Sequence, residues 1–165
     1  MPLSELLVNE FDGELANTKR VLERVPVDKW DWKPDEKSGS LGWMSSHVAT
    51  LPGFAIAICG GDRYEIEGGA RTKVDQPSDL IKVFEQVAQE ARAAVSKVSD
   101  PQMHEKWLLT WKGTKIVEMP RYSALRGMCF NHLIHHRGQL TTYLRALGAP
   151  VPGLYGPSAD EKFEQ

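Results

Sequence analysis

The chain has 165 residues, of which 20 are basic and 22 acidic, so its net charge is −2. A chain of this length fits one domain that buries about 70% of its unfolded surface, so folding requires no disulfide or structural metal. The basic residues form no block typical of nucleic-acid or anionic-membrane binding, and no run reaches the apolar length of a membrane span. We therefore expect a single domain over residues 1–165 with no nucleic-acid or membrane partner.

Two further features bear on the compartment of the protein. The first five residues lack the basic start and apolar core of a signal peptide. Cys59 and Cys129 lie far apart in apolar sequence, which is typical of buried thiols rather than of a disulfide. Both features predict a reducing, cytoplasmic location.

The N-terminal half of the chain predicts two helices from the spacing of its apolar residues. The first covers residues 3–25 and is stopped by Pro26, and a polar loop with two tryptophans follows over residues 28–39. Ser40 is a suitable N-cap for the second helix, which covers residues 41–58. Pro52 lies inside that pattern, so we expect a kink there, and Gly60-Gly61 closes the segment.

The C-terminal half predicts two more helices and one hairpin. A polar connection over residues 62–76 leads to the third helix, which begins at Ser78 or Asp79 and is ended by Asp100-Pro101. Residues 107–119 break the helical period and predict a short β-hairpin, with Trp107 and Trp111 as its apolar anchors. The fourth helix covers residues 122–147, with Gly148 as its C-terminal stop and an extended tail beyond it. The fold class is therefore all-α, a four-helix bundle with a short β-hairpin before the last helix.

The fourth helix carries three of the five histidines of the chain. His132 and His136 fall within its apolar stripe, and residues four apart on a helix have Cβ atoms roughly 5–6 Å apart on one face. His135 lies at the edge of the stripe. It would replace His136 as the inward-facing histidine only if the helix were rotated. The second helix offers His47 on its apolar side, whereas His104 precedes the hairpin in polar sequence and is expected at the surface.

A single histidine on an apolar face is usually a core residue whose ring nitrogens find hydrogen bonds. Two histidines in one stripe weaken that interpretation, because up to four ring nitrogens then need partners. Metal sites in helical bundles are built from inward side chains of facing helices, and neutral imidazole is the commonest metal ligand. The pattern favours a divalent-metal site formed by His47, His132 and His136.

The sequence resembles the DinB/YfiT-like family of metal-dependent helical proteins over nearly its whole length. Its most specific segments are His135-His136-Arg137-Gly138-Gln139-Leu140 and Tyr155-Gly156-Pro157-Ser158-Ala159-Asp160-Glu161. The resemblance implies a four-helix bundle, one histidine ligand from the second helix and two from the fourth, at the positions of His47, His132 and His136. It also implies a homodimer. The chain departs from the expected pattern at Asp35, where a histidine is expected in the Trp-Lys-Pro loop.

Three protein ligands leave a coordination position open, which is typical of catalytic sites, and imidazole suits zinc, nickel and iron. Because characterised relatives include thiol-dependent transferases, the resemblance favours a metal-dependent transferase that joins a low-molecular-weight thiol to an electrophile. The alternatives are a non-catalytic metal-binding stress-response or dimerisation module, and a metal-dependent hydrolase, for which no nearby HExxH-type glutamate is found. Arg137 is a candidate for holding an anionic thiol cofactor or for pairing, as an exposed arginine, with an acidic surface residue.

The neighbours of the three histidines are candidates for orienting them. A ligating histidine usually has a hydrogen-bond partner on its other ring nitrogen, and Asn131, His135 and Gln139 are near enough in sequence to supply one. Cys129 lies one turn before His132, but its apolar setting favours packing over metal contact.

Overall fold

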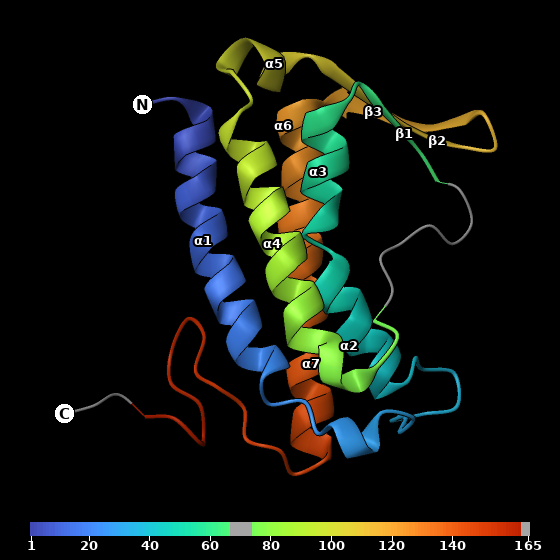
Figure 1. Ribbon diagram of the computed structural model, residues 1–165, viewed down its shortest axis with the longest axis vertical. Coiled ribbons are helices and arrows are strands. Elements are labelled where there is room, and N and C mark those ends of the chain that lie inside the picture. The colour runs from blue at the N-terminus through green and yellow to red at the C-terminus, as the bar shows by residue number, and fades with distance from the viewer. Residues whose placement is uncertain (67–73, 163–165) are drawn as a thin grey trace.

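The computed structural model describes residues 1–66 and 74–162, and this part of the chain is mostly helical with one small sheet (Figure 1). The α-helices are α1 (Leu3–Leu22), α2 (Leu41–Thr50), α3 (Gly53–Gly60), α4 (Leu80–Ser96), α5 (Asp100–His104), α6 (Arg121–Ala124) and α7 (His132–Ala146). Helices α1, α4, α2 followed by α3, and α6 followed by α7 run along the long axis of the molecule (Figure 1). The prediction of an all-α four-helix bundle is therefore met only in part, because two of the expected helices are interrupted and a sheet is present.

Helix α1 ends earlier than the expected Val25. Its backbone tightens after Leu22, where the N–H groups of Arg24 and Val25 donate to carbonyls only three residues back, at 3.1 and 3.2 Å. The short 3₁₀ helix η1 (Val27–Lys29) follows Pro26. Phe11 lies inward from α1 and stacks on Phe130 with ring centroids 4.6 Å apart, so this helix is anchored to the core by aromatic packing.

Helix α2 begins as expected, because the Ser40 side chain accepts a hydrogen bond from the Trp43 N–H at 3.1 Å. The expected kink at Pro52 is a full break, since proline has no N–H and its ring collides with the preceding turn. Contrary to the sequence-based expectation, Leu41–Gly60 passes as a membrane span by length and composition alone. However, 56% of its most apolar window is buried inside the protein, which is what a core segment requires.

Helix α4 is preceded by the 3₁₀ helix η2 (Pro77–Asp79), close to the predicted start. Asp100-Pro101 was expected only to end this helix, but it opens α5. The Ser99 hydroxyl accepts from the Gln102 N–H and the Gln102 side chain accepts from the Ser99 N–H, which forms a capping box. Proline in the first turn of a helix loses no hydrogen bond, so Pro101 favours this start.

The predicted hairpin is present as β2 (Lys106–Trp111) and β3 (Thr114–Pro120), which pair antiparallel across Lys112-Gly113. Both turn residues have positive φ, at 49° and 73°, as a two-residue hairpin turn requires. The prediction missed β1 (Arg63–Glu65), which pairs parallel to β2 and makes the sheet three-stranded in the order β1-β2-β3. The predicted connection over residues 62–76 also contains residues 67–73, which lie outside the described residues.

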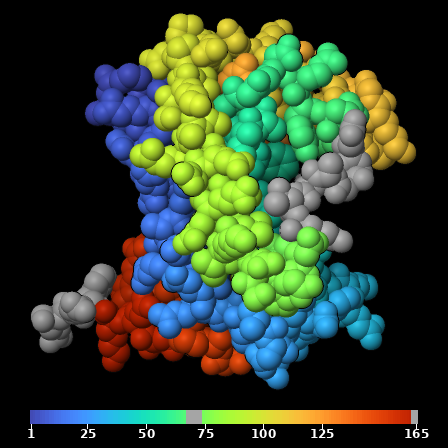
Figure 2. All heavy atoms as spheres, viewed as in Figure 1, coloured from blue at the N-terminus to red at the C-terminus, as the bar shows by residue number. Residues whose placement is uncertain are grey.

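The predicted fourth helix is divided into α6, the π-helix η3 (Leu125–Asn131) and α7. Gly148 has φ of 71° and ends it, as predicted. The segment beyond Gly148 is tied to the body: Arg20 donates to the Gly153 carbonyl at 2.5 Å, and Arg145 pairs with Asp160 at 2.5 Å. Figure 2 shows this C-terminal segment packed beside the end of α1.

Candidate metal centre

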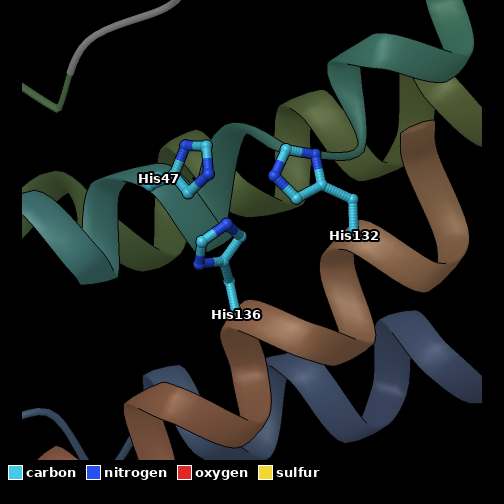
Figure 3. A group of neighbouring side chains, drawn as sticks. All are labelled: His47, His132 and His136. Carbon is cyan, nitrogen blue, oxygen red and sulfur yellow. The ribbon is translucent and has the colours of Figure 1, made fainter. Parts of the chain in front are cut away.

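Three histidine side chains from two helices converge on one point. His47 comes from α2, and His132 and His136 come from successive turns of α7 (Figure 3). Their ring centroids are 4.4 Å apart for His47 and His136, 4.7 Å for His132 and His136, and 5.2 Å for His47 and His132. One ring nitrogen from each lies within 4.8 Å of the others. The structure thus brings together the three residues that the sequence selected.

The π-helix η3 is followed directly by α7, so His132, the first residue of α7, lies at the junction between two helical geometries. The backbone N–H of His132 donates to the Cys129 carbonyl, and its ring Nδ1 lies 3.3 Å from the Met128 carbonyl. Helical stretches of the π type occur frequently at functional sites. A carbonyl can only accept, so this contact favours the tautomer with hydrogen on Nδ1 and the lone pair on Nε2.

The ring of His136 is held in the same way by a side chain. Its Nδ1 lies 2.7 Å from Gln139 Oε1, one turn along α7. An amide oxygen accepts, so the imidazole donates through Nδ1 and presents the Nε2 lone pair toward the centre of the group. Of the predicted orienting residues, Gln139 is confirmed as a hydrogen-bond partner, whereas Asn131 is exposed at the end of η3.

Two further aromatic rings border the histidine group. Trp43 lies one turn before His47 on α2 and stacks on its ring, with centroids 5.1 Å apart and planes at 19°, although 54% of its surface is exposed. His135 is exposed and meets the ring of His136 edge-on at 4.9 Å, outside the three converging rings. Trp43 was missed in the sequence, where its spacing of four from His47 was the available signal.

The donor set fits a divalent metal ion. The three rings are half-buried, so an ion there is partly removed from water yet can be reached by a ligand. Among the described residues, the group that converges contains three imidazoles and neither carboxylate nor thiolate. Neutral imidazole suits zinc, nickel, iron and copper, and three ligands leave a position for a fourth.

The structure places Arg137 on another side of α7, in a buried ion pair. Only 1% of the residue is exposed, and its guanidinium lies 2.6 Å from the Glu14 carboxylate. It also donates to the Glu14 carbonyl at 2.9 Å, to Thr18 and to the Tyr155 hydroxyl. Burial and the hydrogen bond to Glu14 raise the pKa of Tyr155. Of the two predicted roles, pairing with an acidic residue is realised, but the pair is buried and not at the surface as predicted. Cofactor binding by Arg137 stays a prediction.

The remaining candidates lie away from the three histidines or pack in the core. Cys129 is buried, its Sγ lies 3.9 Å from the Pro52 carbonyl, and burial raises its thiol pKa. Asp35 is exposed and accepts a hydrogen bond from the Lys37 N–H at 2.9 Å. His104 is exposed at the end of α5, as expected. Of the two predicted hairpin anchors, Trp107 is fully buried in β2, whereas Trp111 is 49% exposed and does not anchor the hairpin in the core.

A mostly helical protein in which two helices supply three converging imidazoles belongs to the class that can bind one divalent metal ion. The chain matches the model of the DinB family over residues 1–164. The chain belongs to the DinB family.

Individual proteins and solved structures agree with this assignment. YjoA of Bacillus subtilis is 24% identical over 147 residues, covering 88% of this chain and 91% of YjoA. YrdA of the same organism is 46% identical over only 44 residues, which span 27% of this chain and 26% of YrdA. The crystal structure of YjoA has a TM-score of 0.70 at 19% identity and covers 96% of this chain and 99% of its own.

A second DinB-like crystal structure, from Bacillus cereus, gives a TM-score of 0.71 at 19% identity, with coverage of 93% of this chain and 98% of its own. At such low identity these likenesses establish the fold alone.

Proposed function

We propose that the protein is a divalent-metal-dependent transferase that joins a low-molecular-weight thiol to an electrophilic small molecule. The observation that carries the proposal is the histidine group itself: three half-buried imidazoles, two of them with Nδ1 against an oxygen acceptor. Closed structural zinc sites use four protein ligands, so three favour a site that takes a ligand from solution.

The proposed reaction forms one C–S bond and breaks two bonds, the S–H bond of the thiol and the bond to the leaving group. When bound, the divalent ion supplies Lewis acidity that lowers the pKa of a coordinated thiol. The sulfur gives an electron pair to the electrophilic carbon and forms a C–S bond, while the leaving group departs with the electron pair of its own bond. The thiol proton passes to solvent, so atoms and charge balance.

The protein residues have distinct tasks in this proposal. Gln139 and the Met128 carbonyl hold the rings of His136 and His132, so that both present Nε2 to the same point. Trp43 covers one face of the His47 ring and limits its rotation. These contacts prepare the ligand set before the ion arrives, which reduces the ordering cost of binding.

Three parts of the proposal concern the setting of this chemistry. Zinc, nickel and iron are the metals considered, since imidazole accepts all three. The thiol must stay reduced, so the proposed compartment is the cytoplasm. The proposed assembly is a homodimer, to be checked by light scattering, and the partners are a small-molecule thiol and an electrophile.

Metal content is the first test. Purified protein reloaded with zinc, nickel or ferrous iron should contain one equivalent by elemental analysis. His136→Ala should lose the ion while keeping its helical circular dichroism. The matched control is His135→Ala, which removes the exposed neighbouring imidazole on the same helix and should retain the metal. A folded wild type that takes up no metal would refute the proposal.

Catalysis is the second test, and it separates the transferase from the two alternatives. Metal-loaded protein is screened with several biological thiols and a chromogenic electrophile, and turnover that requires both thiol and metal supports the transferase. Metal binding without turnover favours the non-catalytic module. Metal-dependent ester cleavage without a thiol favours the hydrolase, although the converging group itself supplies no carboxylate as general base.

A further inference from the structure

A cavity lies directly beside the histidine group. It has a volume of about 280 Å³, and His47 forms part of its wall. The rest of the wall includes Phe54 and Ala57 from α3, Val87 and Glu90 from α4, and Tyr64 from β1. The cavity wall therefore contains one candidate metal ligand together with side chains of α3, α4 and β1.

Aromatic rings connect the cavity to the histidines. The ring centroid of Phe54 lies 6.0 Å from that of His132 and 6.0 Å from that of Tyr64, with the Phe54 and Tyr64 planes at 70°. This arrangement gives apolar and aromatic surface on the path from the metal ligand to the sheet. Aromatic rings pair favourably edge-to-face or offset at such separations, so an aromatic guest would find suitable partners.

Glu90 is the one acidic side chain in the wall among the described residues. It is exposed at the surface end of the cavity and accepts a hydrogen bond from Gln86 at 3.2 Å. A carboxylate next to an apolar wall repels an anionic guest and leaves a neutral guest unaffected. In the metal-free protein, the Glu90 carboxylate thus disfavours guests that carry a carboxylate or phosphate.

We infer that this cavity binds the electrophile, and that the electrophile is an uncharged molecule with a single substituted aromatic ring. The assignment of the guest as electrophile rests on the proposed function. An engineered apolar cavity of about 150 Å³ holds benzene, so 280 Å³ accommodates one ring with small substituents. Pockets for drug-sized ligands typically begin at about 300 Å³, so this volume suits a single ring better than a drug-sized ligand.

The first experiment measures binding to metal-free protein, so that it does not depend on the metal. Dinitrobenzene, a neutral ring without a leaving group, is titrated by equilibrium dialysis. Ala57→Phe fills the cavity and should weaken binding about tenfold or more. Ala94→Phe adds the same ring at a half-buried alanine of α4 outside the cavity wall and should leave binding unchanged. Equal binding by both folded variants would overturn the inference.

A second pair of variants tests the charge selection without changing the core. Glu90→Lys should strengthen binding of dinitrobenzoate relative to dinitrobenzene by about fivefold. Glu85→Lys makes the same charge change at an exposed residue of α4 that does not line the cavity, and should leave the ratio unchanged. An unchanged ratio in Glu90→Lys would overturn the inference even if Ala57→Phe does not fold.

The two proposals fail separately. Dinitrobenzene binding that Ala57→Phe abolishes, in a protein without thiol-dependent turnover, would retain the cavity as a ligand site and reject the transferase. Thiol transfer to chlorodinitrobenzene that Ala57→Phe leaves intact would retain the transferase and reject the cavity as the electrophile site.

Discussion

The buried ion pair between Arg137 and Glu14 gives the sharpest test of how this fold is stabilised. We consider Arg137→Met, which keeps a long apolar stem in the same space but removes the guanidinium. The change removes the 2.6 Å ion pair and the 2.9 Å hydrogen bond to the Glu14 carbonyl. It leaves the Glu14 carboxylate 11% exposed, with the Tyr155 hydroxyl as a donor at 2.7 Å.

The expected cost follows from that uncompensated charge. Removing one partner of a buried ion pair typically destabilises a protein by about 3–5 kcal/mol, because the remaining ion stays desolvated. For a domain of this size 1 kcal/mol lowers the melting temperature by about 2–4 °C, so the expected loss is about 6–20 °C. Glu14→Gln, which leaves the guanidinium unpaired, should cost a similar amount.

The measurement is urea unfolding followed by circular dichroism, with a double-mutant cycle over Arg137→Met and Glu14→Gln. The matched control is Arg126→Met, which breaks the pair between Arg126 and Glu10. That pair also joins α1 to the C-terminal helical segment, through η3, but its side chains are 30% and 41% exposed. An exposed pair contributes at most about 1 kcal/mol, so the control should stay close to wild type.

The reasoning is refuted if Arg137→Met unfolds at the same urea concentration as Arg126→Met. A variant that keeps its stability and its metal but loses thiol affinity would instead assign the guanidinium to cofactor binding.

Three other changes have clear expected outcomes. Gln139→Leu should weaken metal binding by about 10–100-fold, as measured by chelator competition, because it removes the acceptor that orients a ligating imidazole; an unchanged affinity would contradict this role. Gly42→Ala should lower the free energy of unfolding by about 1–3 kcal/mol, because an added Cβ would lie 2.3 Å from Trp30 Nε1. Its control is Gly13→Ala, whose added Cβ would have no atom within 4 Å and which should raise the free energy of unfolding by up to about 1 kcal/mol, as measured by urea unfolding. Burial raises the pKa of Cys59 to about 11, so the neutral thiol predominates at pH 7. Alkylation of Cys59 by iodoacetamide should therefore be slow at pH 7 and accelerate up to about pH 11. Fast labelling at pH 7 would contradict the burial argument.

Side-chain periodicity located the histidine group because each of its members lies in an apolar stripe. His132 and His136 share the α7 face with Leu133 and Leu140, which are fully buried, so the helical period alone turned them toward the core. His47 follows the same rule on α2. Local signals for the ends of elements also worked, since the Ser40 cap and the Gly148 stop act through neighbouring backbone groups.

The features that the sequence did not reveal depend on distant partners or on alternatives of similar energy. Strand β1 has only three residues and exists through its pairing with β2, more than forty residues later. The π-helix before His132 has the same apolar pattern as an α-helix, so composition does not distinguish them. Arg137 is buried because Glu14 lies opposite it, a contact between residues 123 positions apart. The capping box at Ser99 depends only on nearby residues, and the prediction missed it by treating Asp100-Pro101 solely as the end of the preceding helix.

Under the proposed function, the separation of the three histidines along the chain would make metal availability part of the folding equilibrium. His47 and His132 come together only when α2 and α7 pack, so the unfolded chain lacks the assembled site. An ion present at one hundred times its dissociation constant would therefore add about 2.7 kcal/mol to the free energy of unfolding. The melting temperature should therefore rise with free metal concentration. A chelator would then return the melting temperature to that of the metal-free protein, which stays folded.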